Sequence, residues 1–141
     1  MLEKCGLHWR DTFQLEKATQ EELRQLAAIF VLDRMGPPAA EALPALRRLA
    51  RDGSPIVRFC ALCAICSIGP TEQDKPLLVR ALLRDKDWSS RCKGADGLAE
   101  LGTKARSAVP ALHKALADGH KEVRSSARRA LARVSPNADK H

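Results

Sequence analysis

The chain has 141 residues, which is the size of one typical domain, and its 45% hydrophobic and 29% charged residues exclude a disordered tail. Aromatic residues make up only 4%, so the core must be aliphatic. The longest apolar stretch, residues 56–68, is shorter than the ~20 residues of a membrane span and contains Arg58. Five irregularly spaced cysteines, with no secretory signal at the N-terminus, predict reduced thiols and a cytoplasmic location.

Identical residues recur every 33 positions along most of the chain. Glycine, aspartate and arginine each form such a column: Gly36, Gly69 and Gly102, then Asp52, Asp85 and Asp118, then Arg58, Arg91 and Arg124. Only eight residues are glycine, so three coincident columns in one register indicate an internal repeat rather than chance.

Apolar residues recur at helical spacing in both halves of each repeat. The second halves carry Val57, Ala61, Ala64, Ile65 and Ile68 and their counterparts one and two periods later. The first halves carry the columns Leu46, Val79 and Leu112, and Ala50, Leu83 and Leu116. This spacing forms one stripe of an amphipathic helix, so each repeat is predicted to be two helices, A and then B.

Glycine and proline mark the predicted helix ends. Helix B is predicted to start at Ser54 and Pro55, and each column glycine falls just past the end of a B helix, where a left-handed residue is expected. Pro44 and Pro110 either open helix A or kink it. Pro76 stands one position early relative to both.

In chain order, we predict one solenoid domain over residues 1–141. Residues 1–19 are expected to form an irregular N-terminal cap that uses Leu7, Trp9, Phe13 and Leu15. Residues 20–35 fit a B helix without its A helix, with Ala28, Val31, Leu32 and Met35 in the buried columns. Three full repeats follow, and their bounds are 36–68, 69–101 and 102–134. Residues 135–141 are predicted to be a tail.

The segment from Leu101 to Asp118, continued by Val123-Arg124 and Ala130-Leu131, resembles a HEAT repeat, and more closely the short bacterial HEAT-like type also found in phycobilin lyases. The resemblance covers residues 36–134. It implies an all-α fold, a right-handed α-solenoid of antiparallel helix pairs (an ARM/HEAT-like superhelix) whose B helices line the concave surface. It also implies a structural ladder of ion pairs, formed by Asp52–Arg58, Asp85–Arg91 and Asp118–Arg124.

Motifs of catalysis and cofactor binding do not occur in the sequence. There is no HExxH, GxSxG or GxGxxG, so we predict no enzyme activity, no cofactor and no small-molecule substrate. Cys60, Cys63 and Cys66 form a CxxCxxC pattern. On a helix, the first and third would lie ~9 Å apart along the axis, too far for ligands of one metal ion. The sequence therefore favours small apolar residues at these positions and predicts no metal site.

One face of the predicted B helices is unusually apolar in the N-terminal half. Its residues, together with an aromatic residue at the turn of the second repeat, are the candidates for binding a partner: Leu26, Ile29, Phe30, Phe59, Leu62, Cys63, Cys66 and Trp88. Two interpretations stay open. The N-terminal cap covers the face, or the face is an exposed interface for a partner or a second copy.

Positive charge gathers in the C-terminal part of the chain. Residues 102–141 contain nine cations and three anions and carry +6 of the net +7. The last predicted helix supplies a basic patch made of Lys121, Arg128, Arg129 and Arg133. This patch is either the polar outer face of a terminal repeat or a surface for phosphates or an acidic protein. Because no aromatic residue interrupts it, any binding to nucleic acid would be non-specific.

The sequence thus predicts a non-catalytic scaffold or adaptor that binds another protein, or itself, on the concave face of its B helices. The alternative is binding of nucleic acid or an acidic partner through the basic patch. A weaker alternative, suggested by the repeat type alone, is a lyase-like chaperone for a tetrapyrrole. No interaction with a membrane is expected.

Overall fold

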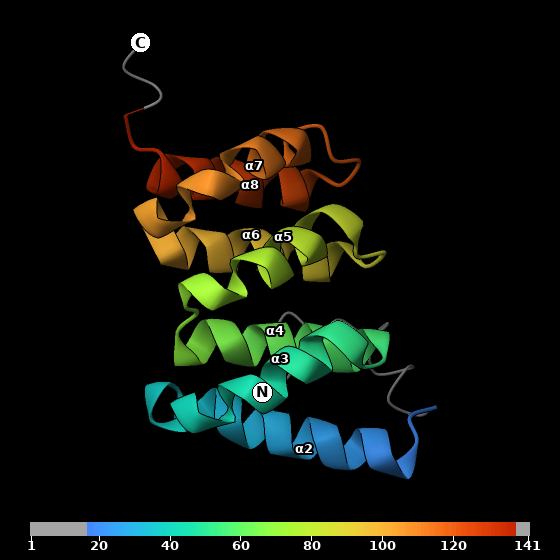
Figure 1. Cartoon of the computed structure of the whole chain (residues 1–141). Helices are drawn as coiled ribbons and strands as arrows, with labels where there is room; N and C mark the ends of the chain where they lie inside the picture. Colours follow the sequence, from blue (N-terminus) through green and yellow to red (C-terminus); the bar gives the residue numbers. More distant parts are fainter. Residues whose placement is uncertain (1–16, 138–141) are drawn as a thin grey trace. The chain divides into compact units, whose positions relative to one another are not determined.

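The computed structural model describes residues 17–137, and within this range every regular element is a helix. In chain order (Figure 1) the elements are α2 (Gln20–Met35), η2 (Pro37–Ala42), α3 (Leu43–Asp52), α4 (Pro55–Ile68), η3 (Glu72–Asp74), α5 (Lys75–Arg84), α6 (Trp88–Leu101), η4 (Gly102–Ala108), α7 (Val109–Ala115) and α8 (Lys121–Val134). The predicted all-α fold is confirmed. Leu7, Trp9, Phe13 and Leu15 of the predicted cap lie outside the described residues.

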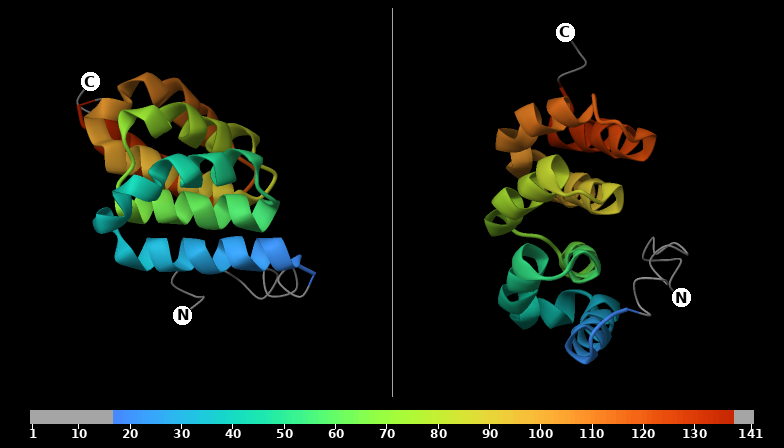
Figure 2. Two further views of the ribbon diagram at one scale, coloured as in Figure 1. Left: turned by 60° about the horizontal axis from the view of Figure 1, so that its bottom comes forward. Right: turned by 90° about the vertical axis from the view of Figure 1, so that its right-hand side faces the viewer.

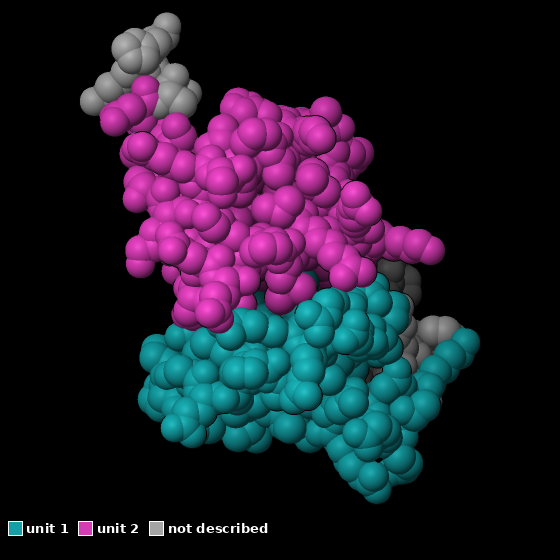
Figure 3. Space-filling model, in the orientation of Figure 1, with its two compact units in different colours: residues 1–68 teal, residues 69–141 magenta. Residues whose placement is uncertain are grey.

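The helices form two compact units, residues 1–68 and residues 69–141 (Figure 3). The division coincides with a predicted boundary between repeats. In unit 1, α2 and α3 both pack against α4, and α2 and α4 lie side by side in the views of Figures 1 and 2. In unit 2, α6 packs against both α5 and α8, and α7 packs against α8. Each unit is therefore built from helical hairpins stacked on a neighbouring B helix, the pattern of an α-solenoid.

The predicted stripe of the B helices forms the core of both units. In α4 the side chains of Val57, Ala61, Ala64 and Ile65 are completely buried. Their counterparts in α6 and α8 are also buried, apart from the half-buried Leu131. Because these columns recur once in every repeat, each B helix presents a similar apolar surface to its neighbours.

The three column glycines end the B helices. Gly36 and Gly102 have φ values of 64° and 58°, and Gly69 has a φ of 120°. At Gly36 and Gly102 the ψ values are −142° and −134°, outside the left-handed helical region that the sequence predicts. This backbone region is open essentially only to glycine, so a side chain at either position would strain the turn into the next repeat.

Prolines open the helices of the A layer and do not kink them. Pro44, Pro76 and Pro110 each lie in the first turn of an α-helix. A backbone amide in this turn has no acceptor within the helix, so proline, which lacks the amide hydrogen, breaks no helical hydrogen bond there. A 3₁₀ segment precedes each of these helices and completes the A layer. Of the two alternatives for Pro44 and Pro110, the structure selects the first.

The early proline shifts the register of α5 by one residue. The sequence predicts Val79 and Leu83 as buried, but Val79 is half-buried and Leu83 is 39% exposed. Leu78 and Leu82, one position earlier, are buried in their place. Because Pro76 fixes the start of α5 one residue before the starts of α3 and α7 in the repeat, the whole apolar stripe moves with it.

The sequence also places four residues of α2 wrongly. Ala28, Val31 and Met35 are exposed and Leu32 is only half-buried, although their counterparts in α4 are all buried. In later repeats this side of a B helix is covered by the A helix before it. Within residues 17–137 no A helix precedes α2, and its outer side therefore meets solvent.

Gly94 sits where α6 crosses the backbone of α5 at close range. A Cβ atom built on Gly94 would lie 2.6 Å from the carbonyl oxygen of Leu78 and 2.7 Å from the amide nitrogen of Leu82. Both are main-chain atoms, which cannot move aside as a flexible side chain can. The glycine thus permits a close contact between α5 and α6, although glycine is unfavourable inside a helix.

We predict that Gly94→Ala lowers the free energy of unfolding by about 1–3 kcal/mol, because the clash outweighs the ~1 kcal/mol gain in helix propensity. Urea unfolding followed by circular dichroism measures the change. Gly119→Ala is the matched control, since a Cβ there meets nothing within 4 Å. An unchanged or higher stability of Gly94→Ala would contradict the close approach.

Candidate partner-binding surface

The apolar face of unit 1 is largely buried. Of the eight candidate residues, five have 1–7% of their surface exposed: Leu26, Ile29, Phe59, Leu62 and Cys63. Of the two interpretations that the sequence left open, burial at these five positions favours a covered face over an exposed interface. For the three residues of α4 the physical reason is that this helix is apolar on nearly all sides, and a helix of that kind is stable only when most of its surface is buried.

Three candidates retain partial exposure. Phe30 of α2 and Cys66 of α4 are half-buried in unit 1. Trp88 opens α6 in unit 2 and stacks on His120, with ring centroids 4.2 Å apart and an angle of 6° between the ring planes. This stack joins the A–B turns of two consecutive repeats, and it therefore gives Trp88 a structural contact.

The cysteines of the CxxCxxC pattern follow one another along α4. Cys60 and Cys63 are buried and Cys66 is half-buried, and none of the three forms a disulfide bond. Among residues 17–137, no three His, Cys, Asp or Glu side chains come together as a set that could hold a metal ion. In unit 2, burial raises the pKa of the Cys92 thiol, so this group stays protonated and weakly nucleophilic at neutral pH.

The aspartate and arginine columns meet at the turns between A and B helices. Arg58, Arg91 and Arg124 each donate a hydrogen bond to a backbone carbonyl of their own turn, at 2.7–3.0 Å. The guanidinium of Arg91 also bonds both carboxylate oxygens of Asp118, at 2.9 and 3.2 Å. In unit 2, the ion pair between Arg91 and Asp118 thus joins two consecutive repeats. The hydrogen bonds that these arginines donate within their own repeats go to backbone carbonyls.

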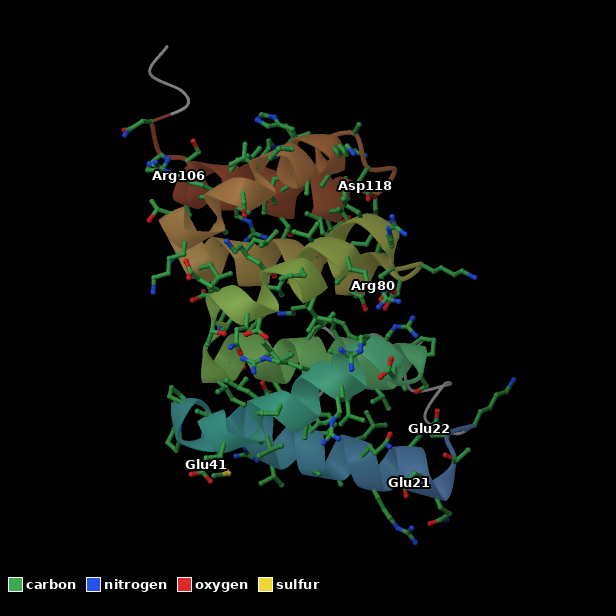
Figure 4. All side chains as sticks on the ribbon, in the orientation of Figure 1. Glu21, Glu22, Glu41, Arg80, Arg106 and Asp118 are labelled. Atoms are coloured by element: carbon green, nitrogen blue, oxygen red, sulfur yellow. The ribbon has the colours of Figure 1, made fainter. Side chains whose placement is uncertain are left out.

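Asp118 is held in its ionised form by these contacts. Burial alone would raise the pKa of Asp118, but hydrogen bonds from the His120 backbone amide and from Arg91 outweigh it and lower the pKa below its ordinary value. Figure 4 shows Asp118 at the turn before α8. Because the paired side chains are only 14–19% exposed, solvent screens this ion pair less than a surface pair.

Two of the basic-patch residues face carboxylates on the neighbouring B helix. Arg129 lies 4.0 Å from Asp96, and Arg133 lies 3.7 Å from Glu100. Burial raises the pKa of Asp96, while the charges of Lys93 and Arg129 act in the opposite direction. We call these four paired residues of α6 and α8 the α6–α8 face. The α6–α8 face has a net charge of zero, so two of the four cations of the basic patch are neutralised by carboxylates.

Sequence reasoning missed this neutralisation, although the repeat contains its signal. Asp96 and Arg129 are one repeat period apart, and so are Glu100 and Arg133. Residues of one column stack on neighbouring B helices, and opposite charges in one column therefore meet. Lys121 and Arg128 remain exposed, and neither forms an ion pair with a residue of the described range.

A sequence model of HEAT repeats matches residues 13–91 and 76–140 of the chain. No curated protein and no solved structure matches it. None of the described helices has the length and apolar character needed to cross a membrane.

We predict that Asp118→Asn lowers the free energy of unfolding by about 1–2 kcal/mol at pH 7, because Arg91 loses its carboxylate. The lowered pKa of Asp118 stabilises the fold above the unfolded-state value of about 3.9, and this contribution is lost as pH falls through the folded-state pKa. The difference between wild type and variant should therefore shrink between about pH 5 and pH 2.

Urea unfolding at several pH values measures this difference. Asp52→Asn is the matched control in the same column, because the Asp52 side chain is 69% exposed. Its effect should stay within about 0.5 kcal/mol. A gap between wild type and Asp118→Asn that is the same at every pH would contradict the account of Asp118.

Proposed function

Because the chain belongs to the HEAT-repeat family, whose members typically act as non-catalytic scaffolds for protein–protein interaction, we propose that it binds a partner protein through the α6–α8 face. The B helices of a HEAT repeat are the helices expected to line the binding surface. In unit 1, most of the candidate binding residues on the B helices are buried. In unit 2, the residues of the α6–α8 face are charged and accessible. The residues that we expect to contact the partner are therefore the paired charges of the α6–α8 face and not the apolar residues of unit 1.

The exposure of the paired charges is the observation that carries this proposal. Arg129 and Arg133 are 71% and 60% exposed, and Asp96 and Glu100 are 39% and 53% exposed. Exposed ion pairs contribute only about 0–1 kcal/mol to folding, so the fold does not need these residues. Charges of both signs in a fixed order can select a partner with the complementary order and speed its approach.

We predict that the double variant Arg129→Glu and Arg133→Glu loses at least about tenfold of its binding to the partner, because four like charges then meet on the α6–α8 face. Quantitative mass spectrometry of proteins retained by immobilised wild type and variant measures the loss. Arg80→Glu with Arg84→Glu on α5 is the matched control, since both residues are exposed in the same unit. Equal retention by wild type and the α8 variant would contradict the proposal.

Binding of nucleic acid is the second candidate, and it rests on Lys121 and Arg128. These two cations are exposed and lack a carboxylate partner among the described residues, while Arg129 and Arg133 each have one. Two free cations provide too little charge for tight binding to phosphates at physiological salt.

For a DNA duplex of about 20 base pairs, we predict a plot of log K against log salt with a slope of about −2, the value for two phosphate contacts. The dissociation constant should be weaker than about 1 µM at ~150 mM salt. Fluorescence anisotropy at several salt concentrations measures both. A slope near −4 would mean that all four residues of the basic patch contact phosphates, and would favour nucleic acid as the partner.

A further inference from the structure

Arg124 on α8 occupies the position in its repeat that Arg91 occupies on α6, 33 residues earlier. Nη1 of Arg91 donates a hydrogen bond to the backbone carbonyl of Asp85 at 3.0 Å. In the same way, Nη1 of Arg124 donates to the backbone carbonyl of Asp118 at 2.7 Å. Both arginine side chains are half-buried. The fold therefore holds the guanidinium of Arg124 in place at its turn, as it holds that of Arg91.

The second edge of the Arg91 guanidinium shows what this position binds. Its Nε and Nη2 atoms donate to the two carboxylate oxygens of Asp118, in the next repeat, at 2.9 and 3.2 Å. Two parallel hydrogen bonds of this kind are the strong form of an arginine–carboxylate contact. Within residues 17–137 no repeat follows α8, which lies in the last layer of unit 2 (Figure 1). No described carboxylate bonds the same edge of Arg124.

Two further cations lie in line with Arg124. Lys121 and Arg128 are exposed and stand three and four residues away, so the three side chains share one side of α8 over about 10 Å of its length. None of the three forms an ion pair with a described residue. We call them the α8 cation row. Arg129 and Arg133 each follow an arginine of the row by five residues, a rotation of about 140°, and therefore lie on another side of the helix.

We propose that the α8 cation row binds an acidic segment of a partner protein, with one carboxylate on the Nε–Nη2 edge of Arg124 and others beside Lys121 and Arg128. The pair between Arg91 and Asp118 is the precedent for the first contact. Charge complementarity supports the other two. The interaction goes beyond the proposed function, because the α6–α8 face uses different residues on a different side of α8.

The position of Arg128 favours an acidic segment over another repeat of the same kind. Its counterpart on α6 is Ala95, which is completely buried in unit 2, where α8 packs against α6. A further repeat stacked on α8 in this manner would bury the charged side chain of Arg128. Burial of a charge is costly unless an opposite charge is buried with it. An acidic segment supplies that opposite charge.

An NMR titration of the full chain with a synthetic acidic peptide tests the proposal. The peptide is based on alanine and carries three glutamates at spacings of three and four residues, and a matched peptide carries glutamines in their place. At about 20 mM salt, the glutamate peptide should bind with a dissociation constant on the order of 0.1–1 mM, the range for a few ion pairs at a surface. The glutamine peptide should bind at least about tenfold more weakly, since it has no charge to pair. The largest shift changes should include the Nε–H signal of Arg124.

Substitutions in the row separate its contacts. Arg124→Gln should weaken binding of the glutamate peptide at least about fivefold, because the two-bond contact is lost. Arg124→Lys should weaken it about threefold, since lysine keeps the charge but not the planar fork. Arg128→Gln should weaken it about two- to threefold, and it stays informative if Arg124→Gln fails to fold, because the Arg128 side chain is exposed. Arg84→Gln on α5 is the matched control: it removes one exposed charge from the same unit and should bind like wild type.

Equal affinity of wild type, Arg124→Gln and Arg128→Gln for the glutamate peptide would overturn the proposal. Equal affinity of wild type for the two peptides would overturn it too. Asp139→Asn should bind the glutamate peptide like wild type. A gain of more than about threefold in this variant would mean that the chain's own C-terminal segment competes for Arg124, and would overturn the proposal of a partner.

A DNA duplex of about 20 base pairs, titrated in parallel, distinguishes carboxylates from phosphates. If Arg124→Gln weakened binding of the duplex and left binding of the glutamate peptide unchanged, the row would be a phosphate site and the proposal would be overturned. None of these variants changes a residue of the α6–α8 face, so a failure here is distinct from a failure of the proposed function.

Discussion

Close packing of each B helix against its neighbours within its own unit is the constraint on which the rest of this structure depends. The column that holds Ala61, Gly94 and Ala127 is fully buried in all three repeats and contains only very small residues. At Gly94 even a methyl group would meet the backbone of α5. Such interiors are close-packed, so the size of these side chains sets how near the helices come.

The same packing explains why the two units present different surfaces. In unit 1, α4 has apolar residues on nearly every side and is mostly buried, which leaves little of its surface for a partner. In unit 2, α6 and α8 bury only one stripe each and keep charged residues outside. The outer side of α2, where Ala28, Val31 and Met35 are exposed, is the remaining case, an apolar surface exposed in the described residues.

Much of the fold could be predicted from the sequence, because one regular period repeats both the apolar stripe and the glycines that end it. The burial of Ala61, Ala64 and Ile65 follows directly from this pattern. The exposure of Val31 does not follow from the pattern. The repeat shows that this position can pack against a neighbouring helix, but it does not show whether such a helix is present. The burial of Phe59 could not be predicted, because an apolar helix face is compatible with a core as well as with an interface. The neutralisation of Arg129 required reading the column across two repeats.

Native-state hydrogen exchange of individual backbone amides tests the packing account most directly. In unit 1, α4 is held by α2 and by α3, while the outer side of α2 is exposed. Amides in α4 should therefore exchange slowest in this unit and those of α2 much faster. Equal protection of α2 and α4, or rapid exchange in α4, would contradict the claim that stacked B helices hold the fold together.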